Sequence, residues 1–225
     1  MYEKNSKPLG YFGAFVLDVA ILTICFLIWM MISTIYHSGR QNSVAGLKEP
    51  VQTDVSGSFR LSKGSYDCTI TYKCSYDIEA LVVHTKEYPE SDDMADTLSP
   101  LDLALAWGKV AEMNEEIDFG WEQSDRHCRV GALQQADVDK LGGVDAITAS
   151  FSNNHIIPAE KCVEKQLLSI RRGDRVRLRG YLVNVDGYDR SKNRGACWYS
   201  SISRTDVGQG ACEVFYVTNV DIIED

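Results

Sequence analysis

Several residue patterns that identify metal and redox proteins are missing from this sequence. None of its seven cysteines belongs to a Cys-x-x-Cys pair, which leaves a zinc ribbon or a thioredoxin-like motif without support. The acidic loop at residues 184–195 lacks the D-x-[DN]-x-[DN]-G order and the closing glutamate of a calcium-binding loop. The sequence therefore predicts neither a metal site nor a cofactor.

Positive charge is also scarce. The chain has 23 lysines and arginines against 32 aspartates and glutamates, and the deficit lies in residues 51–225, whose net charge is −10. An acidic domain is repelled by nucleic acid and by anionic lipid head groups. Nucleic acid is therefore not an expected partner. Internal repeats and low-complexity tracts are absent as well.

A long hydrophobic run is the most prominent feature that is present. Residues 11–36 contain one formally charged residue, Asp18. About 20 apolar residues are enough for a helix to cross the hydrocarbon core of a bilayer. The alternative is a cleaved secretory signal, but the run exceeds the usual signal core and no A-x-A site follows it. We therefore expect one uncleaved transmembrane helix, with the lipid bilayer as its partner.

Asp18 is the expected site of a polar contact inside the membrane. A carboxylate at the centre of a membrane costs about 2.5–3.5 kcal/mol on insertion scales. Either the helix tolerates Asp18 by protonation or by reaching the head groups, or the side chain bonds to a polar group on another transmembrane helix. Such interhelical bonds contribute about 0.6–2 kcal/mol. The second interpretation is preferred, and it makes another membrane protein a candidate partner.

The side of the membrane is predicted from cysteine and not from charge. Two lysines precede the run and one arginine and one lysine follow it closely, so the positive-inside rule does not decide. Six cysteines lie between positions 68 and 212, and an even set suits disulfides in an oxidising compartment. We expect an extracytoplasmic C-terminal domain. Cys68 and Cys74 can pair only if the chain turns back between them, because six residues of strand span about 20 Å.

The composition changes along the chain and divides it into four segments. These are an N-terminal tail at 1–10, the transmembrane helix at 11–36, a polar tether at 37–58 and a soluble domain at 59–225. Alternating apolar residues predict strands from Phe59 to Tyr72 and over Ile78–Thr85. A helix is predicted at Ser99–Met113, where a serine cap and a first-turn proline precede apolar residues at helical spacing.

The C-terminal half predicts a second helix and a bent strand. The helix begins at Pro158 and stops before Gly173. The strand that follows, Asp174–Val185, changes its buried face at Gly180, which is typical of a strongly bent strand. Two more strands are expected near Ala196–Ser203 and Cys212–Val220. The predicted fold class is α+β: a mostly antiparallel, small-barrel (OB-like) domain with two helices.

Four blocks of sequence resemble an uncharacterised family of small bacterial single-pass membrane-anchored proteins. They are SPLDLALAWG (99–108), NHIIPA (154–159), GDRVRLRGYLVNV (173–185) and SSISRTDVGQGACE (200–213). The resemblance covers most of residues 99–225. It implies a bacterial envelope setting, with the anchor in the inner membrane, and it implies no reaction, because the family carries no assigned activity.

Two of these blocks hold the densest group of polar residues. His155, Arg204 and Asp206 are weak candidates for catalysis, and Cys212 lies close by in the sequence. A histidine, a cysteine and a carboxylate are the residue types that a thiol hydrolase needs. The spacing matches no known signature, however. A satisfied histidine at a helix start and an Arg204–Asp206 pair that holds a turn explain the same residues.

Arg175, Arg177 and Arg179 are weak candidates for ligand binding. They are part of the only concentration of positive charge in the acidic domain, and on an OB-like surface they would suit nucleic acid or an anionic ligand. No aromatic residues alternate with them, so intramolecular ion pairing is the preferred interpretation.

The leading function is a membrane-anchored envelope protein that presents a binding domain to an envelope protein or an anionic ligand. One alternative is a membrane-tethered hydrolase that uses His155, Arg204 and Asp206. The other is an OB-type nucleic-acid-binding module.

Overall fold

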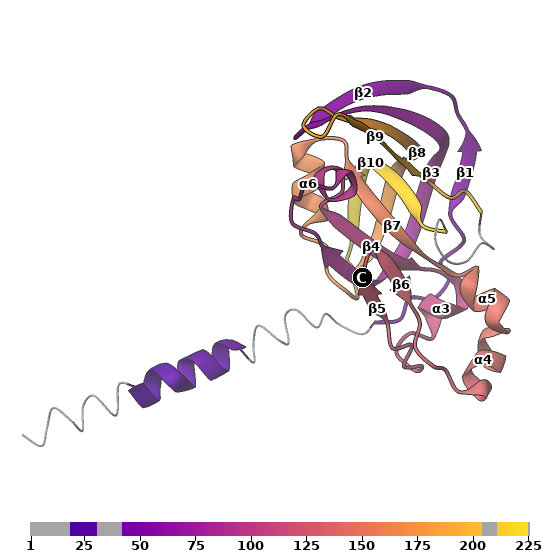
Figure 1. The fold of residues 1–225 in the computed structure, drawn as a ribbon. Helices are drawn as coiled ribbons and strands as arrows, with labels where there is room; N and C mark the ends of the chain where they lie inside the picture. The colour runs from indigo at the N-terminus through magenta and orange to yellow at the C-terminus, as the bar shows by residue number, and fades with distance from the viewer. Residues whose placement is uncertain (1–18, 31–41, 204–210, 225) are drawn as a thin grey trace, which may run out of the picture. The chain divides into compact units, whose positions relative to one another are not determined.

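The computed structural model describes residues 19–30, 42–203 and 211–224. The chain divides into two units, Met1–Gly39 and Arg40–Asp225. In the first unit, residues 19–30 form a helix. The second unit contains all the strands that the structure describes, together with five short helices (Figure 1).

The predicted transmembrane helix is not upheld. None of the helices formed by the described residues is long and apolar enough to cross a membrane. This finding contradicts the transmembrane helix at 11–36 and the bacterial inner-membrane, extracytoplasmic localisation that depended on it. Asp18, the predicted intramembrane contact, lies outside the described residues.

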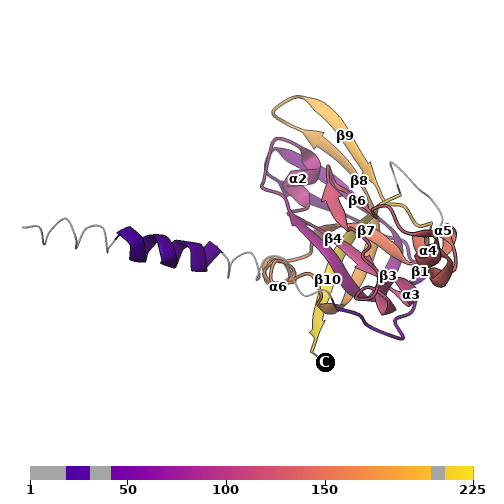
Figure 2. The same ribbon diagram turned by 90° about the horizontal axis from the view of Figure 1, so that it is seen from below.

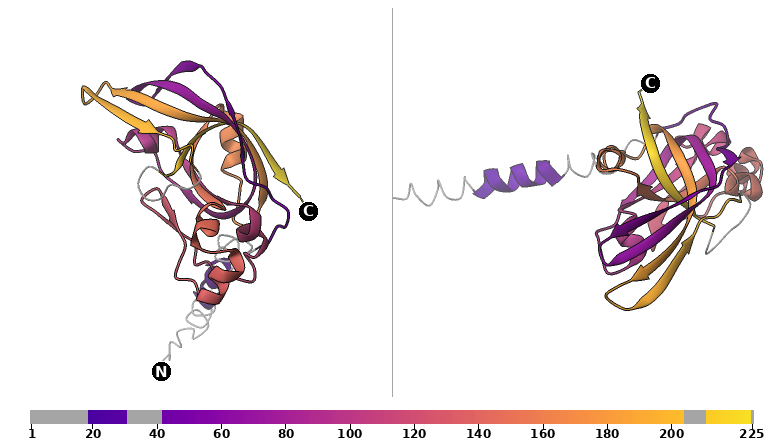
Figure 3. Two further views of the ribbon diagram at one scale, coloured as in Figure 1. Left: turned by 90° about the vertical axis from the view of Figure 1, so that its right-hand side faces the viewer. Right: turned by 90° about the horizontal axis from the view of Figure 1, so that it is seen from above.

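The second unit is built around one mixed sheet of eight strands. Five of its strands follow one another in a closed circuit of hydrogen-bonded pairs, which curves around the interior (Figures 1 and 3). In circuit order they are β3 (Tyr66–Glu87), β4 (Leu101–Ala106), β7 (Phe151–Pro158), β10 (Glu213–Ile223) and β8 (Arg175–Asp189), which pairs with β3 again. All pairs are antiparallel except β7–β10, which is parallel. The predicted mostly antiparallel α+β class is therefore confirmed.

Three further strands extend the sheet at its margins. β1 (Val51–Asp54) and β2 (Ser58–Lys63) pair with different parts of β3, and β9 (Arg194–Tyr199) pairs with the end of β8. The β8–β9 hairpin projects from the rest of the domain in Figure 2. Part of the expected tether belongs to this folded unit, because β1 lies in the sheet and Val44 and Leu47 are buried in the core.

Gly180 allows β8 and β10 to approach closely where both are irregular. A Cβ atom at this position would lie 2.0 Å from the carbonyl oxygen of Tyr216 on β10. The β10 register shifts at the same point, between Val217 and Asn219. Farther along β8, Leu182 and Val183 are both fully buried, so the buried face changes between them. The predicted change of buried face is present in β8, but it lies beyond Gly180, between Leu182 and Val183; at Gly180 itself, the close approach of the β10 backbone requires a glycine.

The helices and a small hairpin fill the connections between the strands. They are α2 (Met94–Leu98), α3 (Gly108–Glu112), the hairpin β5 (Glu122–Ser124) and β6 (His127–Arg129), α4 (Gln135–Leu141), α5 (Val144–Thr148) and α6 (Lys161–Leu167). A helix is present where one was predicted between Pro158 and Gly173, but it is shorter: Pro158 is the last residue of β7, and α6 covers only Lys161–Leu167. Arg171 stabilises its C-terminal end by donating to the carbonyl oxygens of Leu168 and Ile170.

The helix predicted at Ser99–Met113 is wrong over most of its length. Residues Leu101–Ala106 form β4, and only Gly108–Glu112 is helical. All six residues of β4 are buried, so the strand lacks the alternation that distinguishes a half-exposed strand from a buried helix. Asp102, which would fall in the first turn of the predicted helix, lies inside the sheet instead.

Replacing Gly180 with alanine should destabilise the domain. The added methyl group forces the β8 and β10 backbones apart, and overpacking of this kind costs about 1–3 kcal/mol of unfolding free energy. Gly195→Ala is the matched control, because its Cβ atom would come no closer than 3.9 Å to a neighbour, and changes of that kind stay within about 0.5 kcal/mol. Urea denaturation measures both, and equal stabilities would contradict the close approach.

Candidate functional site

His155 is the one predicted catalytic residue that the structure describes. It lies in β7, where its relative exposure is 5%. Arg204 and Asp206, the two residues predicted to act with it, lie outside the described residues. The partners that can be identified for His155 are therefore those supplied by the sheet and its connections.

The register of the sheet places Asp102 beside His155. The two residues are directly opposite in the antiparallel β4–β7 pair. The imidazole Nδ1 is 3.0 Å from Oδ1 of Asp102, which is ion-pair distance, although the N–H direction does not meet hydrogen-bond geometry. The Asp102 side chain is fully buried. An isolated buried carboxylate is costly, so Asp102 requires compensation from nearby charge.

Arg126 supplies that compensation from the tip of the β5–β6 hairpin. Asp125 and Arg126 have φ angles of 49° and 60°, as the two central residues of a type I′ turn do. The turn directs the guanidinium at Asp102, with Nη1 2.7 Å from Oδ1. The positive φ angle of Arg126 is uncommon for a residue other than glycine, and in this conformation its guanidinium reaches the buried carboxylate of Asp102.

All five N–H donors of Arg126 have acceptors within the domain. Nε and Nη2 donate to Asp96, and Nη1 and Nη2 donate to the hydroxyl and carbonyl of Ser99 in addition to the bond with Asp102. The guanidinium also lies 4.0 Å from the centre of the Tyr88 ring. Arg126 therefore stabilises the site and has no donor left for a ligand.

Burial and hydrogen bonding act in opposite directions on Asp96. Burial raises the pKa of its carboxyl, but the bonds from Ser91 and Arg126 outweigh burial, so the pKa is lower than its ordinary value of 3.8. Three buried polar atoms at and beside His155 have no hydrogen-bond partner in the described part of the chain: Nδ1 of His155, Oδ2 of Asp102 and Oδ1 of Asn154. Buried polar atoms without a partner are rare in native proteins.

A cleft of about 330 Å³ opens above His155. Its lining residues come from the hairpin, from β7, from β9 and from the position directly before β10: Arg126, His127, His155, Cys197, Trp198, Tyr199 and Cys212. The Trp198 ring is 4.8 Å from the His155 ring and forms a flat wall. A hydrogen bond to Asp186 raises the pKa of Tyr199 to about 12, so its phenol stays neutral. The cleft is thus a small pocket with one aromatic wall.

The cysteines are free thiols, which corrects the prediction of disulfides. Cys68 and Cys74 lie on the same strand, β3, and the chain does not turn back between them. Burial and the neighbouring Cys212 raise the pKa of Cys128 to about 12, which keeps that thiol protonated and unreactive. Among the residues with described positions, no cluster of histidine, cysteine and acidic side chains could hold a metal ion.

The arginines predicted to bind a ligand each face a carboxylate. Arg175 pairs with Glu79, Arg177 with Asp77 and Arg179 with Asp221. None of them lines the His155 cleft. Their positive charge is balanced within the domain.

Sequence reasoning missed Asp102 and Arg126. The only signal for Asp102 was a carboxylate inside an apolar run, which fitted the first turn of a helix equally well. Arg126 stands in a short polar segment, and nothing local shows that it meets residues 24 and 30 positions earlier.

Removing the Arg126 guanidinium should destabilise the domain strongly. Arg126→Met leaves Asp102 as an uncompensated buried charge, which costs about 3–5 kcal/mol. Arg177→Met is the control, since it breaks an exposed pair with the same chemistry and should leave the unfolding midpoint unchanged. Similar losses for both variants would contradict the compensating role.

Acid should remove the stabilisation that Asp96 provides. Because its pKa is lowered by folding, the ionised carboxylate favours the folded state, fully above the unfolded value of 3.8 and progressively less as the pH falls below it. The stability difference between the wild type and Asp96→Asn should therefore be constant near neutral pH and shrink progressively as the pH falls below 3.8. Unfolding measured across that range tests the sign, and a difference that grew on acidification would refute it.

The comparisons with known proteins identify no relative: no family model, no curated protein and no solved structure matches this chain. The resemblance of four sequence blocks to an uncharacterised bacterial family therefore stays a prediction.

Proposed function

We propose that this chain is a binding protein whose domain holds a small polar ligand in the His155 cleft. The observation that carries the proposal is the buried Arg126–Asp102 ion pair, which places a carboxylate 3.0 Å from the His155 imidazole at the floor of a pocket. Burying a charge costs folding free energy. A buried ion pair next to an open cleft is therefore consistent with a role in positioning a polar group for binding. Trp198 supplies the apolar wall against which the ligand packs.

An OB-like architecture is part of the proposal. If the five strands of the circuit are numbered by their order along the chain, their order around the circuit is 1-2-3-5-4. The helix α6 lies in the connection between the third strand, β7, and the fourth, β8. OB domains bind their ligands on the second and third strands, between the loops that follow strands one and four. Here those strands are β4 and β7, which carry Asp102 and His155, and the two loops supply Asp96 and Trp198. The position of the cleft supports the OB-like interpretation, as an analogy of fold.

Nucleic acid has less support as the ligand. The net charge of −10 over residues 51–225 repels phosphates, and Arg175, Arg177 and Arg179 are paired internally. Arg126 has no donor to offer. A ligand without multiple negative charges fits this surface better.

Hydrolysis is a second candidate function, because Cys212 lines the same cleft as His155. Thiol, imidazole and the Asp102 carboxylate are the components of a cysteine hydrolase. However, the thiol donates to the carbonyl of Arg126 and accepts from Asn153, each at 3.8 Å. In both contacts the partner of the sulfur is a group other than the imidazole. A catalytic thiol needs the imidazole as its base, so this arrangement favours binding over catalysis.

The test uses the full chain and a panel of small ligands: acetate, inorganic phosphate, glucose, glycine amide and uridine. Binding in the cleft should shift the Trp198 indole resonance, and His155→Gln should weaken the affinity at least tenfold while the melting temperature stays within a few degrees. Arg177→Gln, outside the cleft, should bind like the wild type. Shifts confined to other tryptophans, or unchanged affinity in His155→Gln, would refute the proposal. Turnover of a ligand that Cys212→Ser abolishes would establish the hydrolase instead.

A further inference from the structure

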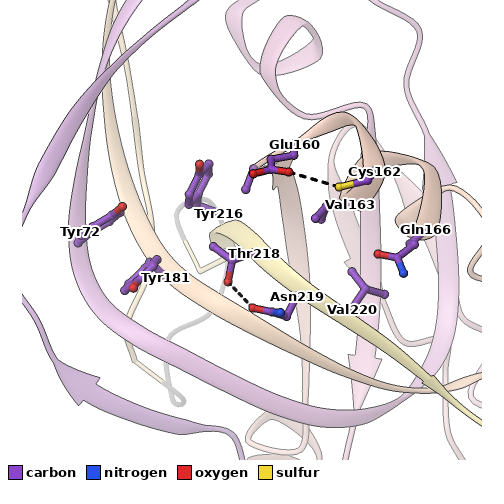
Figure 4. Close-up of a pocket in the computed structure, with 11 residues that line it drawn as sticks. Tyr72, Glu160, Cys162, Val163, Gln166, Tyr181, Tyr216, Thr218, Asn219 and Val220 are labelled. Carbon is purple, nitrogen blue, oxygen red and sulfur yellow. Dashed lines mark hydrogen bonds between the residues drawn. The ribbon is translucent and has the colours of Figure 1, made fainter.

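A second and larger cleft of about 610 Å³ lies on another part of the domain, between α6 and the strands β3, β8 and β10 (Figure 4). It shares no lining residue with the His155 cleft. Its size is typical of small-molecule sites. Three tyrosines, one from each strand, and polar side chains from α6 and β10 line it.

The tyrosines form an ordered group of rings. Tyr216 is directly opposite Tyr181 in the β8–β10 pair, and Tyr72 stacks on Tyr181 with ring centres 4.1 Å apart and planes at 16°. Phe59 packs against both Tyr216 and Tyr72, at 4.9 and 5.9 Å. The three tyrosines are half-buried, so each keeps part of its surface accessible. Mutual packing fixes the rings before any ligand arrives, which lowers the entropic cost of binding.

The phenol groups of Tyr72 and Tyr216 remain neutral hydrogen-bonding groups. Burial, followed by the proximity of Tyr181, raises the pKa of Tyr72. Burial also raises the pKa of Tyr216, with smaller effects from Tyr72 and Glu160. Each tyrosine thus offers a flat apolar body and a hydroxyl that can donate or accept.

Polar side chains with planar ends stand around the rings. Glu160 and Gln166 project from the α6 side and Asn219 from β10, and all three are exposed (Figure 4). Thr218 donates to Oδ1 of Asn219, which orients that amide. Carboxylate and amide groups can each bind two neighbouring hydroxyls.

The charge of the cleft selects against anions. None of its lining residues is a lysine or an arginine, and Glu160 is a carboxylate. A nucleotide or another phosphorylated ligand would meet repulsion from Glu160 and from the acidic domain. The ligand that fits is neutral, with a flat apolar face for the rings and hydroxyl groups at its edge.

We propose that this cleft is a binding site for neutral carbohydrate, with a pyranose ring stacked on the Tyr72–Tyr181 pair and its hydroxyls bonded to Glu160, Gln166 and Asn219. A pyranose ring combines a face of C–H groups with an edge of hydroxyls, which matches the two kinds of surface in the cleft. This site is independent of the ligand proposed for the His155 cleft.

Calorimetry on the full chain tests the proposal with four neutral probes: cellotetraose, maltotetraose, chitotetraose and mannotetraose. At least one should bind with a dissociation constant below about 1 mM, the weak limit of specific binding. Tyr181→Ala should weaken it at least tenfold, and Tyr181→Phe, which keeps the ring, by no more than about threefold. Tyr188→Ala, on an exposed part of β8 away from the cleft, is the matched control and should bind like the wild type.

Gln166→Ala provides a second variant that keeps the fold, because alanine suits an exposed helical position. It should weaken the same oligosaccharide about three- to tenfold with an unchanged melting temperature. Four outcomes would overturn the proposal: no binding of any probe at 10 mM, equal affinity in Gln166→Ala, tighter binding of uridine monophosphate than of the neutral sugars, or loss of sugar binding in His155→Gln.

Discussion

The guanidinium of Arg126 lies where three separate parts of the domain meet. Its hairpin contributes the cation, the connection before β4 contributes Asp96 and Ser99, and β4 itself contributes the buried Asp102. Through Asp102 the same network reaches His155 on β7. Removing the cation would leave a buried carboxylate uncompensated, so the hairpin, the sheet and the floor of the cleft depend on one another.

The strand order of the sheet brings Asp102 and His155 together. A circuit of five strands brings β4 and β7 side by side at the register that opposes Asp102 to His155, and the parallel β10 seals the other edge of β7. Bends in β3 and β8 let the circuit close, and Gly180 is where the backbones of β8 and β10 come nearest. The tyrosines of the second cleft lie on β3, β8 and β10. Both proposed sites thus follow from one closed sheet.

The sequence predicted those features that depend on residues close together along the chain. Gly173 ends the segment after α6 with a φ of 91°, and Gly180 marks the bend in β8, so both could be recognised along the chain. β4 was misassigned because a strand buried on both faces has no alternation to show. The hydrophobic run at 11–36 predicted a transmembrane helix, but none of the helices in the described part of the chain is long and apolar enough to cross a membrane. The sequence makes His155 a candidate site residue, but it does not reveal the neighbours Asp102 and Arg126, because the sheet register and a hairpin turn bring them there from distant positions.

The central claim is that Arg126 and Asp102 hold the His155 imidazole in one state beneath the cleft. The most direct measurement is the nitrogen-15 spectrum of the histidine side chains in the full chain, with His155 assigned by comparison with His155→Gln. The account predicts a single tautomer in the wild type with the proton on Nδ1, facing Asp102, and a mixture of tautomers in Arg126→Met. A wild-type His155 with its proton on Nε2, or the same mixture in both proteins, would contradict it.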